Sequence, residues 1–225
     1  MMRSLSVISA LLLLCGCSVP EVEVPYVPGG MDLCGCPQDW GPSRGLVKMS
    51  SSSSDNEASV GLAWSDEGLY VLFEVLDSNI RAFQTEKDHR ELFLDDVVEV
   101  LLDSGCDRGR EWVEDDLIYH VNALGVKKDD RGTPEGKSDP SYDLDFTHRV
   151  TLQGTLNDES DVDRGYIVEI FMPWTELGTE PRKGLRIGAE FACGDNDGKG
   201  KCQFDWLGIY PFRQPHLFGI LTLSE

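Results

Sequence analysis

Three polar side chains stand in apolar surroundings and together could hydrogen-bond several hydroxyl groups. Glu99 interrupts the apolar run Val97–Leu102. His120 and Asn122 are two residues apart in the segment Leu117–Ala123, so they share one face of a strand. A carboxylate accepts hydrogen bonds, while an imidazole and a carboxamide both donate and accept them. The pattern indicates a polar binding site, with a satisfied polar network at a strand edge as the alternative.

Three glutamates in apolar segments also raise the question of a glycosidase. Such enzymes use two carboxyl groups at a fixed separation, and Glu74, Glu99 and Glu169 are the available set. Nothing in the sequence fixes their separation. The chain also lacks the G-x-S-x-G, P-loop and H-E-x-x-H motifs. We therefore expect a protein that is not an enzyme.

One metal-binding pattern is the oxygen-rich turn Asp195-Asn196-Asp197-Gly198. Calcium takes about six to eight oxygen ligands, often from carboxylates and backbone carbonyls. The turn lacks the spacing of an EF-hand and its closing glutamate. The pattern predicts Asp195 and Asp197 as ligands of a structural calcium ion. The alternative is a turn without metal, because Asp, Asn and Gly favour turns in any case.

The cysteines suggest disulfides in an exported protein. Cys193 and Cys202 flank the turn-rich stretch and are predicted to staple a hairpin across it. Cys106 could join Cys34 or Cys36, which leaves one thiol over. A zinc site is the alternative, although the spacing lacks paired C-x-x-C knuckles and nearby histidines.

The N-terminus predicts export. Arg3 precedes the apolar run Leu5–Leu14, which is too short to span a bilayer. The run ends in Leu14-Cys15-Gly16-Cys17, which resembles the lipobox of bacterial lipoproteins. We expect a signal peptide over residues 1–16 and a lipid on Cys17. The alternatives are an ordinary signal peptide cut near Gly16 and a buried helix.

The residues after the lipobox predict where the protein resides. Ser18 after the lipid-bearing cysteine fits retention in the outer membrane. Residues 17–30 contain three prolines and two glycines and are predicted to form the lipid anchor and an extended tether. The net charge of −20 excludes nucleic acid as a partner, because its phosphates are bound by Lys and Arg. We expect an exported, lipid-anchored protein.

Residues 31–225 are predicted to form one all-β domain. Short apolar segments separated by Gly, Pro, Asn and Asp are typical of a β-sandwich, here of jelly-roll-like type. The one convincing helical turn is Pro173–Leu177. The expected strands are 58–64, 69–76, 97–102, 117–123, 148–152, 166–172, 185–193 and 217–223.

Five strings in order resemble family 9 carbohydrate-binding modules. They are GLYVLFEVLD at 68–77, DDVVEVLLD at 95–103, YHVNA at 119–123, GYIVEIFMPW at 165–174 and FGILTL at 218–223. Each string is weak alone, but five in the right order form a specific pattern. The resemblance implies a sandwich without catalytic residues, usually calcium-bound and often attached to xylan-degrading enzymes. Asp77 and Asp96 lie in these strings and are the first calcium candidates.

The resemblance also assigns a sugar site. Where two tryptophans clamp the sugar in that family, this chain has Phe93 and Phe212, whose smaller rings still stack on sugar C–H faces. The family's acidic hydroxyl acceptor matches Glu99, and its Arg and Asn match His120 and Asn122. At the position of His120, the forked guanidinium donor of the family's Arg is thereby replaced by an imidazole. These five residues are predicted to bind an oligo- or polysaccharide.

Two other functions remain open. Related sandwiches bind haem through axial Met, His or Lys ligands, and Met172 and His120 are conceivable ligands here. No C-x-x-C-H motif is present, which disfavours covalently attached haem. The second alternative is a surface interaction or scaffold protein without a small ligand.

Overall fold

The computed structural model describes residues 19–52, 54–198, 201–209 and 211–225. The predicted signal peptide over residues 1–16 and the predicted lipid site at Cys17 lie outside these ranges. Within them, no helix is long and apolar enough to cross a membrane.

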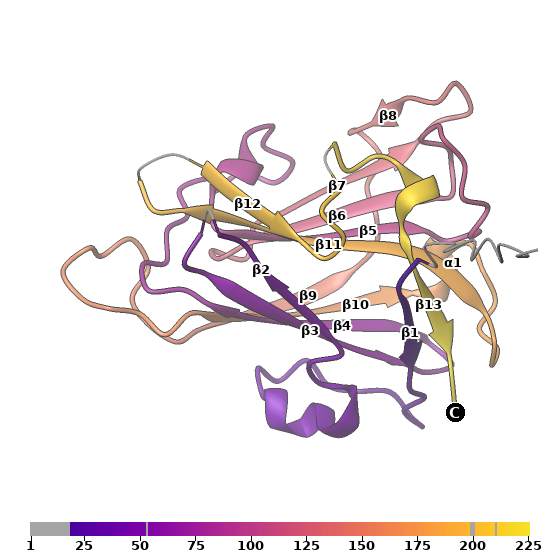
Figure 1. Ribbon diagram of the computed structural model, residues 1–225, viewed down its shortest axis with the longest axis horizontal. Coiled ribbons are helices and arrows are strands. Elements are labelled where there is room, and N and C mark those ends of the chain that lie inside the picture. Colours follow the sequence, from indigo (N-terminus) through magenta and orange to yellow (C-terminus); the bar gives the residue numbers. More distant parts are fainter. Residues whose placement is uncertain (1–18, 53, 199–200, 210) are drawn as a thin grey trace, which may run out of the picture.

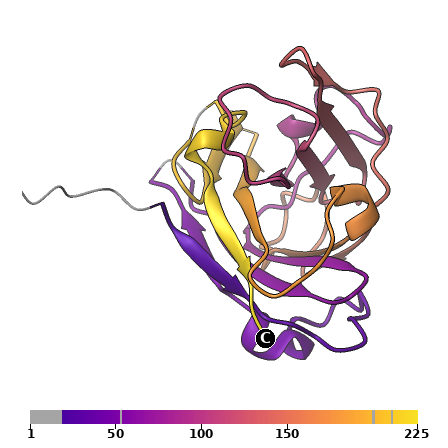
Figure 2. The same cartoon turned by 90° about the vertical axis from the view of Figure 1, so that its right-hand side faces the viewer.

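Two β-sheets pack face to face (Figures 1 and 2). Among the described residues, the larger sheet has eight strands and the smaller has five. The larger sheet runs in the order β1 (Glu21–Val24), β13 (Gly219–Leu223), β11 (Arg186–Asn196), β5 (Val97–Asp103), β6 (Asp116–Asn122), β7 (Lys127–Gly132) and β8 (Ser138–Asp139), and β12 (Lys201–Asp205) also pairs with β11. The smaller sheet runs β2 (Val47–Ser50), β3 (Glu57–Trp64), β4 (Gly68–Leu76), β10 (Tyr166–Pro173) and β9 (Thr147–Leu152).

Helical segments are few and short in the part of the chain that the structure describes. The α-helix α1 covers Trp174–Leu177, and three 3-10 segments cover Pro37–Ser43 (η1), Leu92–Leu94 (η2) and Pro215–Leu217 (η3). The predicted all-β sandwich with one short helical turn is therefore confirmed.

Alternation along the strands builds the core between the sheets. In β4, Leu69, Val71, Phe73 and Val75 point inward, and the antiparallel register places Phe73 opposite Val168 of β10. Strand residues two apart share a face, so the intervening side chains point away from the core. Phe73 meets Phe191 of β11 edge to face, with ring centroids 6.0 Å apart.

Both outer faces are also covered, which explains why several strands are apolar throughout. The segment around η1 packs Trp40 on Tyr70 and Leu72 of the smaller sheet. On the opposite side, residues 206–209 and 211–218 cover the larger sheet, where Ile209 and Phe218 are buried. Figure 1 shows these segments below and above the sandwich.

The N-terminal segment corrects the predicted tether over residues 17–30. Residues 21–24 form β1, which pairs in parallel with β13 so that Glu21 lies opposite Ile220. Val24 is fully buried in the core, and Tyr26 bridges to Trp64. Val22 and Val24 alternate with glutamates, as is typical of an edge strand. The flanking prolines, Pro20 and Pro25, obscured this strand pattern in the sequence. This segment belongs to the domain, which therefore begins before residue 31.

Other differences come from strands without apolar alternation. The strand β7 reads KKDDRG and was not predicted, nor were β2, β8 and β12. The final strand begins at Gly219 rather than Leu217, because Pro215–Leu217 forms η3. Strands of this kind are specified by their neighbours in the sheet rather than by their own pattern.

The predicted disulfide between Cys193 and Cys202 is not formed. The β11–β12 register places Cys193 opposite Phe204 and Cys202 opposite Asp195, so the two cysteines are not direct cross-strand neighbours. Cys193 is a free thiol, fully buried in the core. Burial raises the pKa of this thiol well above its usual value. Cys193 is thus a small apolar core residue.

Candidate functional site

The outer face of the larger sheet brings Glu99 and His120 together. They lie directly opposite each other on β5 and β6, and Nε2 of His120 is 3.6 Å from Oε2 of Glu99. Both side chains are nearly buried, with exposed fractions of 8% for His120 and 3% for Glu99. The predicted pairing of an acid and an imidazole on one face is therefore present.

A third polar side chain at this point comes from β12. The side-chain amide of Gln203 donates a hydrogen bond of 3.2 Å from Nε2 to Oε1 of Glu99. Sequence analysis missed Gln203 because β12 was not predicted. The one available signal was its position in the second arm of the predicted hairpin, after the turn that follows β11.

Asn122 has a different role from the predicted ligand contact. It is fully buried, and its Nδ2 donates to the carbonyl of Gln84 at 2.9 Å and to Oδ2 of Asp95 at 2.8 Å. Its Oδ1 accepts a hydrogen bond from the Val126 backbone at 2.7 Å. Because these atoms are already bonded within the protein, Asn122 positions the chain before η2 rather than meeting a ligand.

Phe93 lies on η2, beside the beginning of β5, and is 38% exposed. The backbone of η2 comes close to β11 at Gly194. A Cβ at that position would lie 2.8 Å from Cγ1 of Val97 and 3.4 Å from the carbonyl oxygen of Phe93. The absence of a side chain at Gly194 therefore lets η2 hold Phe93 at one end of the site.

Phe212 lies toward the other end of the same face. It is half-buried and packs against the outer cluster that contains Leu101, Trp112 and Ile118. Val97, Glu99 and Leu101 are successive outward residues of β5, so the strand runs about 13 Å from the Phe93 end to the Phe212 end. The two predicted stacking residues thus lie toward opposite ends of the strand that carries Glu99.

Basic side chains that sequence analysis missed join this face. Lys128 of β7 lies opposite His120, and burial lowers the pKa of its ammonium group. Arg213, next to Phe212, donates from Nη2 to Oδ2 of Asp130 at 2.6 Å. Lys128 also donates to the Arg90 carbonyl at 3.3 Å, so both basic side chains have partners within the protein. No pattern in the sequence linked them to the site.

The structure separates Glu99 from the other two glutamates and Met172 from His120. Glu74 and Glu169 lie on strands of the smaller sheet, pointing away from the core, whereas Glu99 is on the outer face of the larger sheet. Glu99 therefore cannot form an acid pair with either of them. Met172 points into the core, whereas His120 points away from it. The two side chains therefore do not face a common space in which they could ligate one haem.

The four predicted calcium ligands meet at one end of the sandwich. The Asp77 and Asp96 carboxyl groups shift each other's pKa, and the charge of Asp197 acts on Asp77. Carboxylate oxygens of Asp55, Asp195 and Asp197 all lie within 4.8 Å of one another. We call these five residues the acidic cluster. Asp55 was not predicted, because it follows a serine run that gives no metal-binding signal.

The electrostatics of the acidic cluster fit a hard cation. Burial, and then the neighbouring Asp77 carboxylate, raise the pKa of Asp96 to about 9. Burial also raises the pKa of Asp77 and of Asp195. Oδ2 of Asp77, Oδ1 of Asp195 and Oδ1 of Asn79 are buried without a hydrogen-bond partner. Several unsatisfied oxygens beside like charges are the donor set that calcium takes.

The fold and this face together define a β-sandwich binding domain. The family described as "Carbohydrate family 9 binding domain-like" matches residues 39–225. The chain belongs to this family, as the five sequence strings indicated.

Relatives and solved structures agree with this assignment. The chain is 29% identical to endo-1,4-beta-xylanase A of Thermoanaerobacterium saccharolyticum and 30% identical to exoglucanase XynX of Acetivibrio thermocellus, over 66% and 64% of this chain. It spans only 11% of the length of each. A family 9 module of Caldicellulosiruptor kristjanssonii, solved with cellotriose, superposes with a TM-score of 0.68 at 24% identity, covering 91% of this chain and 93% of that one.

Proposed function

We propose that this protein binds β-1,4-linked oligosaccharides without cleaving them, on the outer face of the larger sheet. The observation that carries the proposal is the opposed pair of Glu99 and His120, with a phenylalanine toward each end of the strand that carries Glu99. The charged acceptor would bind sugar hydroxyls, and the rings of Phe93 and Phe212 would stack on the sugar's C–H faces. The cellotriose complex of the similar module supports this class of ligand.

The test is isothermal titration calorimetry of the full chain with cello- and xylo-oligosaccharides in calcium-containing buffer. The full chain is needed because a truncation at residue 31 would remove β1. We expect the Phe93→Ala/Phe212→Ala variant to bind about tenfold or more weakly. Phe171→Ala is the matched control, since this half-buried phenylalanine lies on the smaller sheet.

Two outcomes would contradict the proposal. Unchanged affinity in the double variant would move the site elsewhere. A folded wild-type protein that binds no sugar, including on a glycan array, would favour a surface interaction or scaffold protein.

We further propose that the acidic cluster holds a structural calcium ion. Asp77 and Asp195 would supply the oxygen atoms that lack a partner, and Asp55 and Asp197 would complete the negative set. Bound calcium would neutralise these charges and fix the strand ends and the β11–β12 hairpin. Calorimetric titration of chelator-treated protein tests this, with Asp195→Asn/Asp197→Asn expected to weaken binding. Equal calcium affinity in wild type and variant would contradict it.

We also propose that the protein is exported and anchored in the outer membrane by a lipid on Cys17. The apolar run and the lipobox-like residues support this proposal. Because β1 begins at Glu21, a lipid on Cys17 would lie within about 14 Å of the sheet edge. The domain would then stay close to the membrane surface. Membrane fractionation in a Gram-negative host tests this, with Cys17→Ser expected to release the protein. A variant that remained membrane-bound would contradict it.

A further inference from the structure

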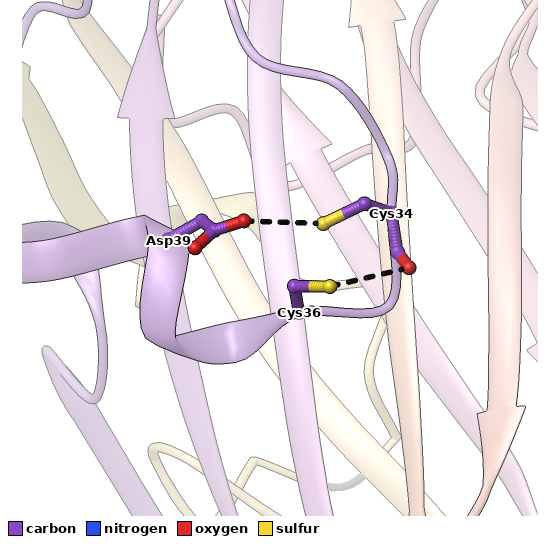
Figure 3. Close-up of side chains that lie close together, drawn as sticks. All are labelled: Cys34, Cys36 and Asp39. Carbon is purple, nitrogen blue, oxygen red and sulfur yellow. Dashed lines mark hydrogen bonds between the residues drawn. The ribbon is translucent and has the colours of Figure 1, made fainter.

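The short loop before η1 gathers three metal-binding side chains on the far side of the molecule from the sugar site. Cys34, Cys36 and Asp39 each offer a ligand atom, and these atoms all lie within 4.8 Å of one another. Figure 3 shows the Cys34 thiol directed at the Asp39 carboxylate, with the Cys36 sulfur beside the Cys34 backbone. Neither the sugar-binding proposal nor the calcium proposal uses these residues.

One distance in the loop matches a tetrahedral thiolate and carboxylate site. The Cys34 thiol donates to Oδ2 of Asp39 over 3.5 Å. Zinc bonds of about 2.3 Å to sulfur and 2.0 Å to oxygen place neighbouring ligand atoms ~3.5–3.8 Å apart in a tetrahedron. The Cys36 sulfur lies within 4.8 Å of both atoms and would move closer to bind the same ion.

The loop is held in place from beneath by Glu169 of β10. This carboxylate is fully buried, and it accepts hydrogen bonds from the Gly35 backbone at 2.6 Å and from Nε1 of Trp40 at 3.0 Å. Gly35 has a φ of +73°, and a Cβ there would clash with Oγ1 of Thr151. Only glycine fits between the two cysteines, so the loop geometry is fixed before any ion binds.

The negative groups around the loop favour a cation. The Asp39 carboxylate accepts a hydrogen bond from the Cys34 thiol, and the buried Glu169 carboxylate lies beneath the loop. A metal ion displaces the thiol protons to solvent and neutralises the negative groups.

The site is also open to solvent. Cys34 and Asp39 line a groove of about 450 Å³ together with Asp32, Trp40 and residues 25–27. Cys34 and Cys36 are half-buried and Asp39 is exposed. An ion can reach the three ligands directly, and the fourth position remains open to water.

We infer that Cys34, Cys36 and Asp39 bind a thiophilic divalent cation of the zinc class. The histidines and C-x-x-C knuckles that a zinc site usually shows are absent from this loop, and Asp39 supplies the third ligand from η1 instead. Two thiolates and one carboxylate with an open position match zinc coordination, whereas an all-oxygen set would match calcium. Binding would fasten the loop and η1 to the smaller sheet.

Cobalt substitution of the reduced, chelator-treated full chain tests the inference. We expect one equivalent of Co²⁺ to give a thiolate charge-transfer absorption, which oxygen ligands cannot produce, and Zn²⁺ to remove it by competition. The Cys34→Ser/Cys36→Ser variant should lose the absorption. Asp39→Asn should weaken Zn²⁺ binding at least as much as loss of an outer-shell partner does, by about 10–100-fold.

The matched control is Asp32→Asn, which removes an exposed carboxylate from the same groove without touching the ligands. If the double cysteine variant does not fold, the comparison of Asp39→Asn with Asp32→Asn still decides the question. Equal Zn²⁺ affinity in these two variants would overturn the inference. So would the absence of a thiolate absorption, or a Cys34–Cys36 disulfide in protein purified without reductant.

Discussion

Both sheets bury glutamates on their outer faces, and Glu169 and Glu99 are held in different ways. Glu169 of the smaller sheet is fully buried and bonded by a backbone amide and an indole from the covering loop. Glu99 of the larger sheet is met by the side chains of His120 from β6 and Gln203 from β12. Glu169 holds the covering loop on the smaller sheet. Glu99 belongs to the group of polar side chains proposed to lie between Phe93 and Phe212.

This difference shows how to separate a structural acid from a binding acid. Two burial values, 0% for Glu169 and 3% for Glu99, do not distinguish them. The partners do, because donors fixed in the backbone and in a buried indole hold an oxygen in one place. Side-chain donors such as Gln203 can turn toward a ligand at small cost.

The largest expected effect concerns the pH dependence of the larger sheet. Burial is the main cause that raises the pKa of Asp96 to about 9, and of Asp116 and Glu190 to about 8. Ordinary carboxyl groups in the unfolded chain titrate near 4. Between pH 4 and the raised pKa values, the folded state binds more protons than the unfolded chain, so the free energy of unfolding falls as the pH rises. Each group lowers that free energy by up to about 1.4 kcal/mol per pH unit.

Thermal unfolding in chelator at pH 5, 7 and 9 measures this. We expect the melting temperature to fall across the series and calcium to restore part of it at high pH. Asp96→Asn should flatten the slope, while Asp158→Asn, at an exposed loop position, should leave it unchanged. A melting temperature that rises from pH 5 to pH 9 would contradict the role of these carboxyl groups.

The next effect tests whether the two covering segments serve different functions. Trp40 covers the smaller sheet and Trp112 the larger one, with exposed fractions of 3% and 4%. Replacing either with Ala should cost about 3–5 kcal/mol of unfolding free energy. Urea denaturation measures that loss. Only Trp112→Ala should also weaken sugar binding, because Trp112 packs with Phe212. Equal effects of both variants on sugar affinity would break the comparison.

A smaller effect is expected from the binding acid alone. Glu99→Gln keeps the shape but removes the charge, and hydrogen bonds to charged groups are worth about 1.5–3 kcal/mol. Sugar affinity measured by calorimetry should therefore fall by about 10–150-fold. Glu74→Gln is the matched control, an outward-facing strand glutamate of the smaller sheet. An unchanged affinity in Glu99→Gln would place the sugar away from this carboxylate.

The smallest effect should come from the glycine of the cysteine loop. Gly35→Ala introduces a Cβ at a positive φ, which costs about 1–2 kcal/mol, and the Thr151 side chain must also shift to make room for it. We expect a slightly lower melting temperature and weaker Zn²⁺ binding, measured by competition with a chromophoric chelator, but unchanged sugar affinity. Loss of sugar binding in this variant would show that the two faces are coupled.

Much of the fold was predictable because its central strands carry their own pattern. The segments around β4, β5, β6 and β10 alternate or are continuously apolar, and each was predicted within two residues. The opposition of Glu99 and His120 was also foreseeable, since each stands out in an apolar strand. Asn122 was misassigned because sequence spacing shows the face of a strand but not what covers it. Its amide is used by Gln84 and Asp95, which come from elsewhere in the chain.

By itself the sequence determined the all-β class, the family and the residue types of the proposed sugar site, because alternation and composition are local properties. Only the tertiary structure decided what depends on contacts between distant segments. It paired β1 with β13, brought Gln203 and Arg213 to the site, and gathered Asp55 with Asp195. It also set Asp39 beside two cysteines over a buried Glu169. Such contacts are fixed by the register and packing of the two sheets, which no single segment encodes.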